Sequence, residues 1–317
     1  MYTLSLKIEI TGSRKWDIDF AHQVEVVRDM ECLTDTCSIT LPKRVKWDGE
    51  SETPIRRGDG VKVWLGYDGQ LELAFVGYVR DVGLKTPVVI TCEDEMYRLK
   101  LTPAKPMAYR SVDLSTLLAD QGLGSAKVMG EQMLGAYRVT DATVASLLGR
   151  LSENGIRSFY MMEGGGSVLY SGVLFERGTQ PVQVFRTGLN IISDQNLTQQ
   201  KAEAMRIKVK AVSLLPDNTK LKLELGDQDG ELRTLHTYNK QEAELRAWAE
   251  QELKRLKVDG LTGSFTTFGF RLVDKLDNIG IIIDGQKMGV YQVKKNVIKF
   301  GVSGYRQEIT LGYRVRS

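Results

Sequence analysis

The sequence predicts a mainly β fold with an α+β insertion: two related β-barrel domains plus a small α+β domain. Apolar residues alternate with polar ones through the first hundred residues, and the same alternation returns in the last third. A period of two is typical of a strand with one buried face. Between these regions lie two helical patterns and a glycine-rich hairpin. We therefore expect domains at 1–103, 104–180 and 181–317.

The first domain contains four clear strand patterns. Alternating or continuous apolar runs occupy residues 4–10, 61–65, 73–79 and 88–92. Glycine and aspartate turns separate them, as at 57–60. Several short strands with such turns favour a barrel or a sandwich.

The middle region reads as α+β. Asp113 can cap a short helix that ends before Gly122. A second helix is expected to begin at Asp141 and to stop at Gly155. A hairpin follows around the three glycines at 164–166.

The last domain carries an insertion of about 216–257, composed of a hairpin and one prominent helix. The helix is expected near 240–257, and Asn239 and Glu242 have the spacing of a capping box at its start. A strand at 220–225 precedes it.

Three segments of the first domain have counterparts in the last. Each set consists of turn, strand, turn, strand with an embedded tyrosine, turn and strand. Short β patterns also coincide by chance, so duplication and coincidence both remain open. If duplication holds, a cyclic trimer of such chains would present six similar modules around one axis. The paired segments are 58–64, 77–82 and 89–93 in the first domain and 276–282, 290–295 and 308–312 in the last.

Bulk composition excludes several classes of protein. Apolar content of 42% and charged content of 26% are those of a folded protein, and 43 basic against 40 acidic residues give no footprint for avid nucleic-acid binding. The amino terminus lacks a signal-peptide pattern, and no run approaches the roughly 18 apolar residues of a membrane span. Cys32, Cys37 and Cys92 are expected to be reduced thiols in a cytoplasmic setting.

Chemical motifs are scarce. His22 and His236 lie far apart in polar alternating segments, where a surface or strand position is expected. No HExxH, GxSxG or phosphate-loop motif occurs. Cys32 and Cys37 lack a second ligand pair for zinc, so burial as small apolar side chains is expected.

Two acidic segments invite functional hypotheses. The segment from Asp227 to Glu231 starts like a calcium loop, but its twelfth position is Tyr238, so a hairpin turn is expected instead. Glu93 to Glu95 could supply a carboxylate pair for glycoside hydrolysis, but an acidic turn at a domain edge is favoured.

Basic and aromatic residues indicate no further site. The basic runs at 294–295 and 314–316 are expected to be solvated faces. A carbohydrate-binding module would need an aromatic platform, and Trp16, Trp47, Trp64 and Trp248 are scattered along the chain.

Several segments together resemble the baseplate hub proteins of Mu-like contractile-tailed phages, the late control D family. The resemblance spans most of the chain in order. It departs from the family pattern at Phe270-Arg271-Leu272 and Leu276-Asp277-Asn278, where a proline and Gly-Asp are expected, so the turn geometry there is in doubt. The segments that carry the resemblance are 55–69, 75–79, 91–96, 226–231, 257–265 and 301–307.

This resemblance implies a structural virion protein of the tail baseplate, assembled in the bacterial cytoplasm. It implies a homotrimeric ring between the tail tube protein and the central spike protein, with a channel through which DNA passes without specific binding. We expect no enzyme activity, no cofactor, no metal and no membrane insertion; the sequence does not assign the interface residues. Trimerisation through strand edges and apolar contacts is the leading hypothesis.

Two alternatives remain. The hub of a related type VI-like injection system is the first, although such hubs are usually fused to a spike, and this sequence ends at Ser317 without one. A tail-tip enzyme that degrades the cell wall is the second.

Overall fold

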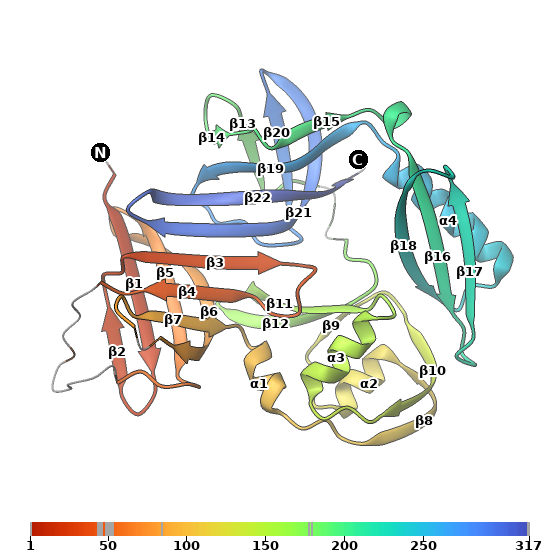
Figure 1. Ribbon diagram of the computed structural model, residues 1–317, viewed down its shortest axis with the longest axis horizontal. Coiled ribbons are helices and arrows are strands. Elements are labelled where there is room, and N and C mark those ends of the chain that lie inside the picture. Colours follow the sequence, from red (N-terminus) through yellow and green to blue (C-terminus); the bar gives the residue numbers. More distant parts are fainter. Residues whose placement is uncertain are drawn as a thin grey trace.

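The computed structural model describes residues 2–42, 47, 54–83, 85–176, 178 and 180–315. Strands dominate the described chain (Figure 1), which confirms the predicted mainly β class. One large sheet contains strands from both ends of the sequence, and three small sheets belong to the middle region and the insertion.

The N-terminal strand group comprises β1 to β7. Its strands pair in the order β2-β1-β5-β6-β7-β4-β3, and helix α1 (Met96–Leu101) follows it. The strands are β1 (Leu4–Thr11), β2 (Lys15–Ile18), β3 (Gln23–Asp29), β4 (Thr36–Thr40), β5 (Gly60–Tyr67), β6 (Gln70–Val82) and β7 (Val89–Glu93).

The C-terminal strand group begins after the middle region. Its strands pair in the order β13-β20-β21-β22-β19, and both β14 and β15 pair with β19. The strands are β13 (Gln183–Arg186), β14 (Ile191–Ser193), β15 (Leu197–Gln200), β19 (Gly260–Phe268), β20 (Asn278–Ile283), β21 (Gln286–Gly301) and β22 (Gly304–Val315).

The two groups share one strand order. With β2 set aside and β14 and β15 taken together as the second strand, each group runs 1-4-5-6-3-2 when its strands are numbered along the chain. The repeated sequence segments fall on β5, β6 and β7 and on β20, β21 and β22, which form the same three-stranded meander in both groups. One difference exists: β1 pairs antiparallel with β5, whereas β13 pairs parallel with β20. The shared order favours duplication over coincidence.

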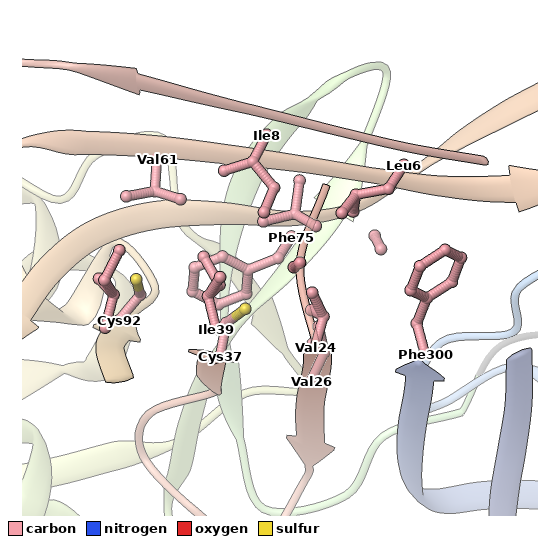
Figure 2. Close-up of a cluster of buried hydrophobic side chains, with 14 of the residues drawn as sticks. Leu6, Ile8, Val24, Val26, Cys37, Ile39, Val61, Phe75, Cys92 and Phe300 are labelled. Carbon is pink, nitrogen blue, oxygen red and sulfur yellow. The ribbon is translucent and has the colours of Figure 1, made fainter. Parts of the chain in front are cut away.

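Strand β21 joins the two groups into one continuous sheet. Its first half pairs with β20, and its second half pairs with β3 from Lys295↔Asp29 to Gly301↔Gln23. We call this β3–β21 pairing the seam. The end of β21 also contributes to the core of the N-terminal group: Figure 2 shows Phe300 beside Val24 and Leu6 in one buried cluster.

The middle region lies to the lower right of the N-terminal group in Figure 1. The predicted hairpin is β11–β12, and Asp113 caps α2 by accepting a hydrogen bond from Thr116 N at 2.9 Å. The predicted start of the next helix at Asp141 is wrong. Thr143 and Ser146 form the capping box, while Asp141 pairs with Arg150 at 2.6 Å. The elements are β8 (Met107–Asp113), α2 (Leu114–Asp120), β9 (Lys127–Met129), β10 (Met133–Val139), α3 (Val144–Ser152), β11 (Arg157–Glu163) and β12 (Gly166–Gly172).

The insertion is a three-stranded sheet covered by one helix. It contains β16 (Ile207–Leu214), β17 (Lys220–Gly226), β18 (Glu231–Tyr238) and α4 (Glu242–Leu256), and a short 3₁₀ helix (Ala202–Ala204) precedes it. Leu245 and Ala249 of α4 pack on Ile207, Val209 and Ala211 of β16.

Two predictions for this insertion are wrong. The turn from Asp227 to Gly230 does not close a hairpin, because β17 and β18 lie on opposite sides of β16, antiparallel and parallel to it. Asp227 accepts a hydrogen bond from Ile207 N at 3.0 Å, which anchors the turn over the start of β16. The helix cap is also displaced: Gln241 and Glu244 form the capping box, whereas Asn239 has a positive φ of 58°.

The loop between β19 and β20 carries a fully buried cation. Lys275 is 0% exposed, and its Nζ lies 2.7 Å from Asp35 Oδ1 and 4.9 Å from the centroid of the Phe159 ring. Asp35 N donates in turn to Asp94 Oδ2 at 2.9 Å. A second pair joins Asp274 of the same loop to Arg28 of β3, at 3.6 Å. We call these five charged residues and the Phe159 ring beside Lys275 the buried charge cluster.

This cluster joins three parts of the molecule. Asp35 and Asp94 belong to the N-terminal group, Lys275 to the C-terminal group and Phe159 to the middle region. Next to Lys275, Leu276 is buried among Met30 and the aromatic residues of β11 and β12. Asp274, Lys275 and Leu276 therefore make these contacts between or within the two segments that depart from the family pattern.

Protonation is coupled to this packing. Three carboxyl groups and only two cations share the cluster, so full ionisation would leave an uncompensated negative charge. Burial, and then the neighbouring Asp35 carboxyl, raise the pKa of Asp94 from 3.8 to about 7. Burial likewise raises the pKa of Asp35.

Stability should therefore fall as the pH rises through the range between 3.8 and about 7. In that range the folded chain holds a proton on Asp94 that the unfolded chain releases, so the free energy of unfolding decreases with pH and levels off above it. Asp94→Asn should flatten this slope, measured by urea denaturation at several pH values. The exposed Asp19→Asn is the control. A variant with the wild-type slope would contradict the assignment to Asp94.

Candidate assembly surface

Exposed apolar side chains gather where the two strand groups meet. Tyr2 is 80% exposed, Phe270 51% and Val302 88%. We call this set the apolar rim; its side chains lie at or near strand ends and keep between 36% and 88% of their surface exposed. The rim comprises Tyr2, Leu4, Phe20, Leu71, Phe268, Phe270 and Val302.

A close approach at Gly269 presents two of these side chains. Gly269 N donates to Tyr305 O at 3.0 Å, and a Cβ on Gly269 would lie only 2.1 Å from the Tyr305 ring. Only glycine permits this contact. The chain then turns through Arg271, whose φ is 56°. Phe268 and Phe270 consequently stay on the outside of the turn.

An aromatic row runs from the rim into the core. The ring centroids of Tyr2 and Tyr67 lie 5.7 Å apart, those of Tyr67 and Tyr305 5.4 Å, and those of Tyr305 and Phe300 5.5 Å. Tyr67 donates from its hydroxyl to Tyr305 O at 2.9 Å. Burial raises the pKa of both Tyr67 and Tyr305, so these hydroxyls stay protonated and neutral. The row ties the end of β5 to the start of β22.

A groove of about 750 Å³ lies beside this row. Residues of both strand groups line it, so its shape depends on their relative position. Its volume is in the range of sites that hold a small molecule or a short chain segment. The lining residues are Tyr2, Tyr67, Asp68, Gln70, Gln183, Asn190, Thr267, Phe268, Phe270, Arg271 and Arg306.

The outer edge of β13, next to this groove, is closed by one side chain. Asn190 accepts from Arg186 N at 2.6 Å and donates from Nδ2 to Val184 O at 3.0 Å. Asn190 N also donates to Arg186 O at 3.1 Å. The amide thus takes the place of a neighbouring strand. Because these groups are satisfied, this edge is a poor template for pairing with another chain.

The histidines lie where the sequence predicts. His22 is exposed, and His236 is half-buried within β18, where burial lowers its pKa. The cysteine expectation holds in part: Cys37 is buried opposite Cys92 in the β4–β7 register, but Cys32 is exposed.

The acidic turn after β7 is more buried than a surface turn. Glu93 is 5% exposed and pairs with Arg80 and Lys100, at 3.2 and 2.7 Å. Asp94 is 4% exposed, accepts a hydrogen bond from Met96 N and belongs to the buried charge cluster. Only Glu95 remains near the surface, where it accepts from the Tyr78 hydroxyl.

The basic run in β21 is paired and only partly exposed. Lys294 lies 2.8 Å from Glu31, and Lys295 lies 3.5 Å from Asp29. Arg314 donates to the carbonyl oxygen of Asp259. Arg316, also part of a predicted basic run, lies outside the described residues.

Two of the four tryptophans do meet in space. Trp16 and Trp47 pack edge to face with centroids 5.5 Å apart, and Arg14 covers Trp16 at 4.7 Å. Both rings are only partly exposed, so they do not form an open platform.

Sequence reasoning did not single out Tyr67, Arg306 or Lys275. The aromatic residues of the rim lie at or near strand ends, where the sequence pattern fits a buried core position equally well. Tertiary contacts alone bury Lys275.

Within the described residues, no group of three or more histidine, cysteine and acidic side chains is placed to hold a metal ion. Among the helices that the structure describes, none is both long and apolar enough to cross a membrane.

Comparisons with solved structures define the fold. The chain has the fold of prophage tail proteins. A tail protein from Neisseria meningitidis matches with a TM-score of 0.63 at 16% identity, over 98% of this chain and 96% of that one. The 43 kDa tail protein of prophage MuSo2 from Shewanella oneidensis matches with a TM-score of 0.63 at 14% identity, over 98% and 97%.

A third similar structure comes from a secretion system. The c3393 protein of Escherichia coli, described as a type VI secretion component similar to the T4 tail proteins gp27 and gp5, matches with a TM-score of 0.52 at 10% identity, over 98% of this chain and 78% of that one. No family model matches the chain, and no curated protein does. The resemblance noted in the sequence is thus confirmed in the fold.

Replacing the edge-closing amide should destabilise the C-terminal group. Asn190→Ala removes two side-chain hydrogen bonds and should lower the free energy of unfolding by about 1–3 kcal/mol, with faster aggregation as the β13 edge opens. Asn190→Asp, which keeps the acceptor for Arg186 N and loses the donor to Val184 O, should cost less. Urea denaturation and light scattering would measure both effects, and an alanine variant as stable as wild type would refute the role of Asn190.

Proposed function

We propose that this chain is the structural hub of a phage-type tail baseplate. It forms a homotrimeric ring that joins the tail tube protein to the central spike protein and leaves a channel through which DNA passes. In this proposal it is a virion component assembled in the bacterial cytoplasm, with no enzymatic activity, no cofactor and no membrane insertion of its own.

The shared strand order of the two groups carries the proposal. Because each chain holds two modules of one topology, a cyclic trimer would present six similar modules on one axis. Such a ring can meet a sixfold partner on one face and a threefold partner on the other. The similarity to two tail proteins, one of them from a prophage, over nearly the whole chain supports this reading.

The apolar rim supports assembly. Tyr2, Phe268 and Phe270 line one groove and are 42–80% exposed, and exposed apolar side chains that lie together favour a contact surface, because their contact with water is unfavourable. The rim lies where both strand groups are present, so a partner seated on it would contact both modules. Apolar contact between copies therefore explains trimerisation better than pairing at the closed β13 edge.

A channel for DNA requires a lining that does not retain phosphates. A ring with a dense Lys/Arg lining would hold DNA through counterion release. Lys294 and Lys295 are each paired with a carboxylate, which agrees with a surface of low net charge.

One alternative has a specific observation in its favour. The fold is also similar to the type VI component c3393, so a hub of a related injection system remains a candidate function. A tail-tip enzyme has less support, because Glu93 is held by two cations and Asp94 is buried and hydrogen-bonded to backbone amides.

Self-assembly can be measured by light-scattering chromatography of the purified chain. We expect about 106 kDa, three times the 35.5 kDa of one chain. Phe268→Ser with Phe270→Ser should shift the mass toward the monomer, because it removes apolar contact area. Leu232→Ser, at a residue 54% exposed outside the rim, is the matched control. A wild-type chain that stays monomeric at every concentration would contradict the trimer.

A further inference from the structure

We propose that the groove between the two strand groups binds an extended, carboxylate-rich segment of a partner protein through Arg271 and Arg306. This inference rests on the proposed function, because it assigns a partner chemistry to part of the assembly surface.

Both arginines are held against aromatic rings. The guanidinium carbon of Arg306 lies 5.2 Å from the centroid of Phe268, and that of Arg271 lies 5.6 Å from the centroid of Phe270. The face of each ring attracts the cation, and each guanidinium carries five N–H donors. The two cations are thereby positioned before any partner arrives.

Neither cation has a carboxylate partner among the described residues. Arg306 donates to Tyr305 O at 2.9 Å, and no salt bridge forms at Arg271 or Arg306 in that part of the chain. The neighbouring acids are already engaged with backbone amides. Asp68 accepts from Thr3 N, and Glu72 accepts from Leu272 N, each at 2.8 Å.

This arrangement fits carboxylates better than other anions. A guanidinium donates two parallel hydrogen bonds to a carboxylate, and the bonds gain strength beside an apolar wall. Phe268, Phe270 and Tyr2 provide that wall, while Gln70 and Gln183 can bond peptide groups. A nucleic acid would call for a longer row of cations to match its phosphates, and among the described residues two cations line this groove.

The mode of binding follows from the neighbouring strand. Asn190 satisfies the outer edge of β13, so the bound segment cannot add as a further strand there. Recognition then comes from carboxylates on the arginines, apolar groups on the aromatic rings and peptide groups on the two glutamines. The groove volume of about 750 Å³ suits a few residues of extended chain.

Fluorescence anisotropy with a defined probe tests the inference on the wild-type protein. The probe is a labelled, amidated hexapeptide that alternates aspartate and leucine, and its partner probe carries asparagine in place of aspartate. We expect the aspartate peptide to bind at least about tenfold more tightly and to weaken as salt is added. Equal binding of the two peptides, or no binding of either, would overturn the proposal.

Variants then locate the site. Arg271→Leu with Arg306→Leu should reduce binding of the aspartate peptide by at least about tenfold, and lysine at both positions should reduce it less. Arg233→Leu is the control, because Arg233 is an exposed arginine paired with Glu231 away from the groove. Undiminished binding in the double leucine variant would contradict the assignment, as would displacement of the peptide by duplex DNA at equal concentration.

The mass of each sample separates this inference from the proposed function. A wild-type trimer that binds neither peptide overturns the groove assignment and leaves the trimer standing. A monomer that binds the aspartate peptide contradicts the trimer and leaves the groove assignment standing. If the double leucine variant loses the trimer and the wild-type trimer binds no peptide, a second copy occupies the groove and the partner assignment is wrong.

Discussion

The ion pair between Lys275 and Asp35 is the contact on which the rest of the structure depends. Lys275 has no exposed surface and Asp35 is 8% exposed, and a buried charge is costly unless it is paired. The pair therefore fixes the loop between β19 and β20 against the segment between β3 and β4. This loop sets Leu276 among the side chains of β11 and β12 and presents Phe268 and Phe270 to solvent.

The seam and the loop act together. Strand β21 supplies backbone pairing from one group to the other, and the buried charge cluster supplies side-chain contacts beneath it. The aromatic row from Tyr2 to Phe300 adds a third connection at the rim. With three connections of different kind, the two groups should move as one body. A groove shared by both groups can then keep a fixed shape, as a binding surface between copies or partners requires.

Local patterns predicted much of this fold. Alternation located β1, β5, β6 and β7, and Asp113 was recognisable as a cap because its side chain meets an amide three residues away. Even the repeated meander was visible, since side-chain alternation and turn residues are properties of short segments.

The remaining features depend on contacts between distant segments. The turn at Asp227 has hairpin composition, yet β16 lies between its two strands, and nothing within the turn signals a third strand. Asp141 is chemically as suitable as Thr143 to cap the helix, but it pairs with Arg150 instead. Lys275 could not be found from sequence either, because its partner Asp35 lies 240 residues away along the chain. The groove of Arg271 and Arg306 could not be found because residues of both strand groups line it.

A double-mutant cycle across the buried ion pair tests the central claim most directly. Lys275→Met leaves Asp35 and Asp94 buried without their cation and should lower the free energy of urea unfolding by about 3–5 kcal/mol. Lys275→Met with Asp35→Asn should recover much of this loss, because the unpaired carboxylate is gone. A strong energetic coupling between the two substitutions is therefore expected. A loss below about 1 kcal/mol for Lys275→Met, or costs that simply add, would show that this pair does not hold the two strand groups together.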